Sequence, residues 1–171
     1  MFCRVKEFKL LGYSYSDWAG SVDDMRSTFG YCFTFGPECF SWCSKKQELV
    51  AQSTLEVEFI ATTAAVNQVI WLKKVMNDLQ LQQENNIEVF VDNQATLAIS
   101  QNPVFHDRTK HFKVKYYFLR EVQRSSEVKP VHCSSDNQLV DIFTKSFHVG
   151  RFEALRDKLG VCAAHNSRGE C

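Results

Sequence analysis

Hydrophobic and polar residues alternate along residues 7–17, which is the pattern of a β-strand. With a period of two, the side chains from Leu11 through Tyr15 to Asp17 project from one side of this strand, and those from Leu10 to Ser16 project from the other. We expect the strand to lie centrally in a sheet, because it carries bulky apolar and aromatic side chains. It ends at a carboxylate, directly before a polar, glycine-containing stretch.

Two further strands are predicted in the first 45 residues. Residues 31–35 are rich in aromatic side chains, Gly36-Pro37-Glu38 is a turn sequence, and residues 40–44 follow it. Short connections between successive strands favour antiparallel pairing. The beginning of the chain is therefore predicted to be an antiparallel meander.

A helical period of about 3.6 residues replaces the alternation from Ser53 onward. Ser53 and Glu56, three residues apart, have the form of a capping box, which is typical of a helix start. Apolar residues continue at helical spacing as far as Leu79. This segment is predicted to be the long helix of the domain.

The second half of the chain alternates between strand and helix patterns. Ser135 and Gln138 again have capping-box form, which predicts a helix from there to about Lys145 with Asp141 in its second turn. The other predicted elements are a strand at 87–91, helices at 94–100 and 109–124, a strand at 128–133 and a helix at 151–159. Three antiparallel strands followed by strands joined through helices predict an α/β fold with a five-stranded mixed sheet flanked by helices. We expect one domain at residues 10–160, a lead-in at 1–9 and a flexible tail at 161–171.

The composition of the chain indicates its cellular compartment more clearly than its function. Lysine plus arginine equals aspartate plus glutamate at 20 each, so a nucleic-acid surface would have to be a local patch. The seven cysteines include no C-x-x-C pair and nothing resembling a signal peptide precedes them, which favours reduced thiols in the cytoplasm or nucleus. No apolar run approaches the roughly 20 residues of a membrane helix. We therefore expect a soluble protein with no membrane partner.

Four carboxylates occupy prominent places in separate predicted elements. Asp17 ends the first strand, Glu58 lies in the second turn of the long helix, Asp92 ends the fourth strand, and Asp141 lies on a late helix. Carboxylates that converge raise each other's pKa unless a cation neutralises them, and oxygen ligands of this kind suit Mg²⁺ or Mn²⁺. The alternative is that each acid is a solvated surface residue.

Four runs in this order, DWAGSVDDMRSTFGY, SWCSKKQELVAQSTLEVEFIA, VDNQATLAISQNPVFHDRTKHF and CSSDNQLVDIFTK, closely resemble the ribonuclease H domain at the end of the polyprotein of copia-type LTR retrotransposons, with plant elements nearest. The resemblance covers roughly residues 10–160. It implies the ribonuclease H fold and metal-dependent hydrolysis of the RNA strand of RNA–DNA hybrids. It also implies two partners, the hybrid itself and the reverse transcriptase domain of the parent polyprotein.

In the family that this chain resembles, four acids hold two divalent ions. The resemblance implies that Glu58 in LEVEF, Asp92 in VDNQ and Asp141 in QLVDIFTK are three of them. The family's first acid lies in a G-[YF]-[ST]-D-x-D-W-A-G pattern, and here its position is occupied by Tyr15. The catalytic and metal-binding set is therefore expected to lack one member.

Tyr15 is expected to impair catalysis. A phenol with a pKa near 10 stays neutral, and its ring would occupy the space of the metal site. Asp17 is a weak substitute, because it lies two residues along the strand, roughly 7 Å away. Hydrolysis is therefore predicted to be lost or reduced by orders of magnitude while the fold is kept.

The remaining candidate residues each have two interpretations. His132 either assists product release or is an ordinary surface residue. Asn93 and Gln94 either reach the hybrid backbone or cap the helix behind Asp92. The cations of the helix at 109–124 either contact phosphates or form a solvated face; those expected to bind nucleic acid are Lys110, Lys113 and Lys115.

We expect the chain to be a monomer. Three hypotheses for its function follow from the sequence. The first is a ribonuclease H domain of retrotransposon origin with a catalytic set broken at Tyr15. The second is a nucleic-acid-binding module that keeps the hybrid groove without the chemistry. The third is a gene fragment with no function.

Overall fold

The computed structural model of the chain describes residues 9–17, 26–48, 53–81, 86–94, 97 and 110–161, with the side chains at 110 and 111 outside that description. The strands are β1 (Leu10–Asp17), β2 (Thr28–Phe35), β3 (Glu38–Lys46), β4 (Ile87–Val91) and β5 (Val128–His132). The helices are α1 (Thr54–Asp78), α3 (Lys110–Arg124), α4 (Asp141–Thr144) and α5 (Val149–Lys158), with a 3-10 turn at Ser135–Asn137. Most of the predicted helix at 94–100, of the lead-in and of the tail lies outside the described residues.

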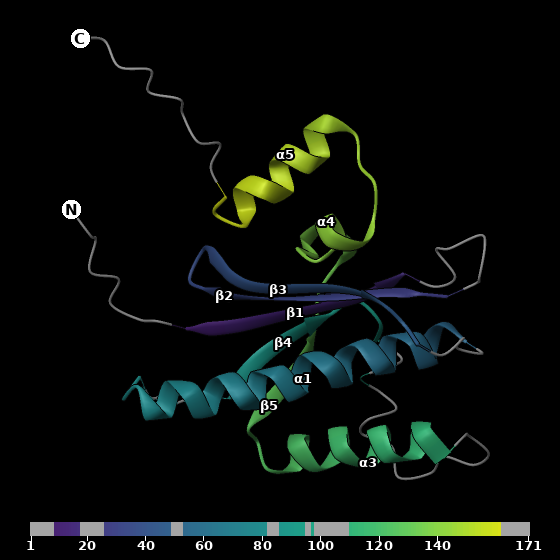
Figure 1. The fold of residues 1–171 in the computed structure, drawn as a ribbon, viewed down its shortest axis with the longest axis vertical. Helices are drawn as coiled ribbons and strands as arrows, with labels where there is room; N and C mark the ends of the chain where they lie inside the picture. Colours follow the sequence, from purple (N-terminus) through teal and green to yellow (C-terminus); the bar gives the residue numbers. More distant parts are fainter. Residues whose placement is uncertain are drawn as a thin grey trace.

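The strands form one sheet in the order β3-β2-β1-β4-β5 (Figure 1). β2 pairs antiparallel with both β1 and β3, whereas β4 pairs parallel with β1 and with β5. A parallel pair needs a long crossover, which α1 provides before β4 and α3 provides before β5. The predicted mixed sheet with a central first strand is confirmed.

Helices cover both faces of the sheet. α1 and α3 lie on one face, and α4 and α5 lie on the other (Figure 1). The alternation of β1 is confirmed: Leu10 packs with the core under α1 and α3, whereas Tyr13 and Tyr15 pack on the opposite face against the cluster that includes Val140 and Leu155. Position 15 is therefore on the α4 side of the sheet.

The β2 strand is longer than predicted, because it pairs with β1 along the whole length of β1. Asp17 lies opposite Thr28, and Tyr15 lies opposite Gly30. A Cβ added to Gly30 would lie 2.8 Å from a methyl carbon of Val140 and 3.1 Å from one of Thr144. The missing side chain at position 30 thus allows α4 to approach the sheet beside Tyr15.

The prediction of one helix from Ser135 with Asp141 in its second turn is wrong. The chain forms a short 3-10 turn, leaves helical conformation at Gln138, and starts α4 at Asp141. The Gln138 side chain is fully buried, and its Nε2 donates a hydrogen bond to the Ser14 carbonyl oxygen at 3.0 Å. This bond to β1 takes the place of helix continuation, so Asp141 lies in a first turn.

Among the residues that the structure describes, no helix has the length and apolar character needed to cross a membrane.

Candidate active site

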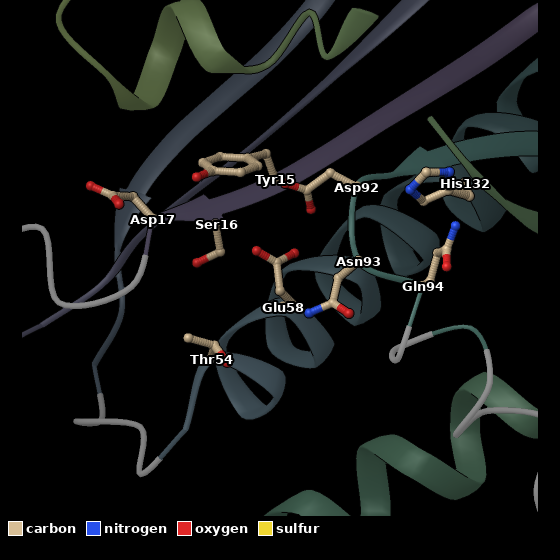
Figure 2. A pocket seen from close by; sticks show the side chains of 9 residues that line it. All are labelled: Tyr15, Ser16, Asp17, Thr54, Glu58, Asp92, Asn93, Gln94 and His132. Carbon is tan, nitrogen blue, oxygen red and sulfur yellow. The ribbon is translucent and has the colours of Figure 1, made fainter. Parts of the chain in front are cut away.

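A cleft of about 540 Å³ opens where β1 and β4 end. Its walls come from the end of β1, the first turns of α1, the residues after β4 and the end of β5 (Figure 2). The lining residues are Tyr15, Ser16, Asp17, Thr54, Glu58, Asp92, Asn93, Gln94 and His132. An acid at the carboxyl end of a strand beside a crevice is the usual position of a functional group in an open α/β sheet.

Glu58 reaches the cleft because α1 begins four residues before it. Ser53 caps the helix as predicted, with its Oγ accepting a hydrogen bond from the Glu56 N–H at 3.3 Å. Burial, and next the charge of Asp92, raise the pKa of Glu58 to about 9, although the Ser16 N–H donates to the carboxylate and opposes the shift. At neutral pH this carboxyl is protonated in the absence of a cation. Its Oε2 is buried without a hydrogen-bond partner among the described residues.

Asp92 follows the last residue of β4 and faces Glu58 across the cleft (Figure 2). Burial raises the pKa of Asp92, the Lys145 ammonium opposes that shift, and the charge of Asp141 adds to it. The Asp92 Oδ1 is also buried without a hydrogen-bond partner in the described part of the chain. Two carboxyl oxygens from separate elements are therefore left unsatisfied at one place, at a typical cost of about 1–3 kcal/mol each.

Asp141 approaches the same region from the opposite face of the sheet. It is 4% exposed in the first turn of α4, and its charge contributes to the raised pKa values of both Glu58 and Asp92. It does not line the cleft. Its Oδ1 lies 3.0 Å from the Lys145 Nζ, so an ammonium group neutralises this acid.

Tyr15 is half-buried among these acids. The Lys145 Nζ lies 4.0 Å from the centre of its ring. Burial raises the pKa of the phenol further, although the hydrogen bond from Lys145 opposes the shift. The residue is therefore neutral, and it places an aromatic ring rather than an anionic oxygen beside these acids.

The other predicted residues fall into two groups. Asp17, Asn93, Gln94 and His132 all line the cleft, with the Asp17 carboxylate directed away from Glu58 and Asp92 (Figure 2). Lys113 and Lys115 lie on α3 and do not line it, and the side chain of Lys110 is outside the described residues. The structure thus brings Glu58, Asp92 and the two amides together in one cleft and leaves Asp141 and the described lysines outside it.

The donor set fits a divalent cation only in part. The unsatisfied oxygens of Glu58 and Asp92 are hard ligands that such an ion would complete. However, no group of three or more His, Cys, Asp or Glu side chains in the described part of the chain is placed to hold a metal ion. The third acid is paired with Lys145 instead.

Lys145 was missed in the sequence as a site residue. It stands four residues after Asp141, the spacing at which oppositely charged side chains meet on a helix. That spacing was the available signal, but the sequence alone does not place Tyr15 under the same ammonium group.

No protein-family model matches the chain. It is 37% identical over 152 residues to the retrovirus-related Pol polyprotein from transposon TNT 1-94 of Nicotiana tabacum, an alignment that covers 89% of this chain and 11% of that protein. It is 34% identical over 160 residues to the retrovirus-related Pol polyprotein from transposon RE2 of Arabidopsis thaliana, covering 94% of this chain and 11% of that protein. The chain therefore spans about a tenth of the length of these curated relatives.

Solved structures share the fold at much lower identity. LC11-RNase H1 in complex with an RNA/DNA hybrid superposes with a TM-score of 0.55 at 13% identity, over 79% of this chain and 93% of that one. The N-terminal RNase H domain of rv2228c from Mycobacterium tuberculosis gives a TM-score of 0.53 at 9% identity, over 88% of this chain and 98% of that one. The expected ribonuclease H fold is confirmed.

Proposed function

Because the chain is a homologue of the retrovirus-related Pol polyproteins of plant transposons and has the ribonuclease H fold, we propose that it is the ribonuclease H domain of such a polyprotein, with a catalytic set broken at Tyr15. The observation that carries the proposal is that Glu58 and Asp92 line one cleft with Tyr15, while Asp141 is linked to Tyr15 through Lys145. Its substrate would be an RNA–DNA hybrid, and its natural partner the reverse transcriptase domain of the parent polyprotein.

In this proposal Glu58 and Asp92 would hold a divalent cation, Mg²⁺ or Mn²⁺, and Asp141 would join them only if it were released from Lys145. The chemistry that such ions would supply is activation of a water molecule and stabilisation of the leaving oxygen of the phosphodiester. Asn93 and Gln94 line the same cleft and would orient the backbone of the hybrid. His132, at the end of β5, would contact the departing product.

Tyr15 breaks this set in two ways. Its neutral phenol contributes no charge to hold a cation. The Lys145 ammonium also lies over its ring and contacts Asp141, so a positive charge stands next to the acids. Like charges repel, so the ammonium opposes the binding of a second cation beside Asp141. Hydrolysis is therefore expected to be weaker by orders of magnitude than with an aspartate at position 15.

The test compares cleavage of a labelled RNA–DNA hybrid by the unmodified chain and by Tyr15→Asp, with Mg²⁺ and then Mn²⁺. We expect negligible cleavage by the unmodified chain and strong cleavage by Tyr15→Asp. Tyr15→Asp combined with Glu58→Gln is the matched control and should be inactive. Strong cleavage by the unmodified chain would show that Tyr15 does not impair the site, and an inactive but folded Tyr15→Asp would show that an acid at position 15 is not sufficient to restore cleavage.

The alternative function is binding of nucleic acid without cleavage. The observation that favours it is the neutralisation of the catalytic region by a side chain of the chain itself, Lys145. In that case hybrid affinity should be similar with a chelator and with Mg²⁺. A fragment without function would instead show no salt-dependent hybrid affinity at all.

A further inference from the structure

A second pocket, of about 510 Å³, lies where β4 and β5 begin. The cleft that contains Glu58 and Asp92, called the acid cleft from here on, lies where β1 and β4 end. The two pockets therefore occupy opposite ends of the parallel strands. In Figure 1 the connection from α3 to β5 is at the end of the sheet away from the start of α1. Its polar lining includes Asn86, Arg120, Arg124, Ser126 and Lys129. We call it the basic pocket.

The charges of the basic pocket are all positive. Among the described residues no acid lines it, although the chain as a whole has a formal net charge of zero. Arg120, Arg124 and Lys129 form no ion pair with another described residue, in contrast to Lys9, which lies 2.7 Å from the Glu88 carboxylate. Three cations around one hollow repel one another, so they favour an anionic occupant.

The same face of α3 continues this charge toward the start of the helix. Lys113, Tyr117, Arg120 and Arg124 are spaced by four, three and four residues, so they share one face. Tyr117 is 64% exposed between the cations. Eleven residues of helix separate Lys113 from Arg124, which at 1.5 Å per residue is about 16 Å.

These features match a sugar–phosphate backbone. Arginine guanidinium groups bind phosphate oxygens through two parallel N–H donors, and the Asn86 amide and Ser126 hydroxyl add neutral donors at the same pocket. An exposed aromatic ring among cations offers a base a surface for stacking, which a carboxylate-rich peptide would not use. We propose that the basic pocket and the adjoining face of α3 bind the backbone of a nucleic-acid strand.

The identity of the strand rests on the proposed function, but the binding does not depend on catalysis. The five residues of β4 separate the basic pocket from the acid cleft, a span of about 17 Å. A strand in the basic pocket is therefore anchored separately from the phosphodiester that faces Glu58 and Asp92. This second anchor would keep a hybrid or its flanking single strand attached without a complete metal site.

The experiment measures binding in EDTA, so that metal-dependent cleavage plays no part. Fluorescein-labelled probes of about 20 nucleotides are used: single-stranded RNA, single-stranded DNA and an RNA–DNA hybrid. Fluorescence anisotropy is recorded against NaCl concentration for the unmodified chain and for Arg120→Gln/Arg124→Gln/Lys129→Gln. The matched control, Lys73→Gln/Lys74→Gln/Lys158→Gln, removes the same charge elsewhere, and circular dichroism checks that both variants are folded.

We expect the pocket variant to lose at least tenfold in affinity at about 100 mM salt, and its log–log salt slope for single strands to fall by about 2, because three phosphate contacts are removed. The control should lose less than threefold. Equal losses in both variants, no loss in the pocket variant, or no binding by the unmodified chain would overturn the proposal. So would displacement of the probe by poly-glutamate with equal or greater affinity, which would identify an acidic peptide as the better ligand.

Hybrid cleavage by Tyr15→Asp separates this inference from the proposed function. If Tyr15→Asp cleaves the hybrid and the pocket variant binds nucleic acid as tightly as the unmodified chain, only the proposed role of the basic pocket is overturned. An inactive Tyr15→Asp with a clear loss of binding in the pocket variant would overturn only the catalytic assignment.

Discussion

Where β1 and β4 end, the chain gathers acids that are mostly buried, and where β4 and β5 begin it gathers cations that reach solvent. Glu58 is 7% exposed and Asp141 is 4% exposed, whereas Lys129 is exposed and Arg120 only partly buried. The acids are constrained by helix starts and by close packing against the sheet. The cations stand on a helix face and an edge strand, with no described ion-pair partner.

This difference shows that one sheet can carry one site that lowers the stability of the fold and another that has little effect on it. Burial at the acid end raises the pKa of Glu58 and of Asp92, which is a free-energy penalty for their charged forms. At the basic end the charges remain near water, which solvates them and lets salt screen their mutual repulsion, so that this repulsion costs the fold little. Substitutions at the acid end should therefore affect folding, and those at the basic end should affect binding.

The largest expected effect is a fall in stability as the pH rises in metal-free protein. The pKa of Glu58 is about 9 in the fold, against about 4.3 for an unfolded chain. Between these values the folded state holds one more proton than the unfolded state, so the free energy of unfolding decreases with pH, by at most about 1.4 kcal/mol per unit. Urea denaturation in EDTA from pH 5 to 9 measures this slope.

Glu58→Gln is the control for that measurement, because the amide does not titrate. The variant should match the unmodified chain near pH 5, be the more stable protein near pH 9, and show a flatter profile. A flat profile for the unmodified chain would mean that Glu58 is charged at neutral pH and that the acid end carries no such penalty.

The second effect tests the packing that brings Asp141 to the site. Gly30→Ala would place a Cβ 2.8 Å from Val140, so α4 must move away from the sheet. Overpacking of this kind costs about 1–3 kcal/mol. Gly150→Ala is the matched control, because nothing lies within 4 Å of a Cβ there. Gly30→Ala should lower the urea midpoint while nucleic-acid affinity in EDTA is retained, and equal midpoints for the two variants would contradict the role of Gly30.

Hydrophobic periodicity and residue spacing were sufficient to predict the elements whose formation depends on residues close in sequence. The alternation in β1, the capped start of α1 at Ser53 and the apolar strand β4 each follow from residues close in sequence. These elements place Tyr15, Glu58 and Asp92, and so the cleft was predictable from the sequence together with the motif resemblance. The mixed character of the sheet followed from which successive strands had a helix between them, whereas the order of the strands came from the structure.

The features that were missed depend on contacts between distant residues. Gln138 ends the 3-10 turn because its amide bonds to Ser14, 124 positions away in the chain. Gly30 admits α4 because of where Val140 packs. The basic pocket combines Arg120 and Arg124 with Lys129 from the next strand, and a charge count along the helix alone does not find such a hollow.

The smallest expected effect compares the removal of positive charge at the two ends. Arg120→Gln/Arg124→Gln should change the free energy of unfolding by less than about 0.5 kcal/mol, because these side chains reach solvent and have no described ion-pair partner. Lys145→Gln removes a single charge but leaves the buried Asp141 unpaired, so it should cost more, at least about 1 kcal/mol. Urea denaturation in EDTA at pH 7 measures both. If the arginine variant proved the less stable of the two, the cations of the basic pocket would have to stabilise the fold itself, and the division between a structural acid end and a binding basic end would not hold.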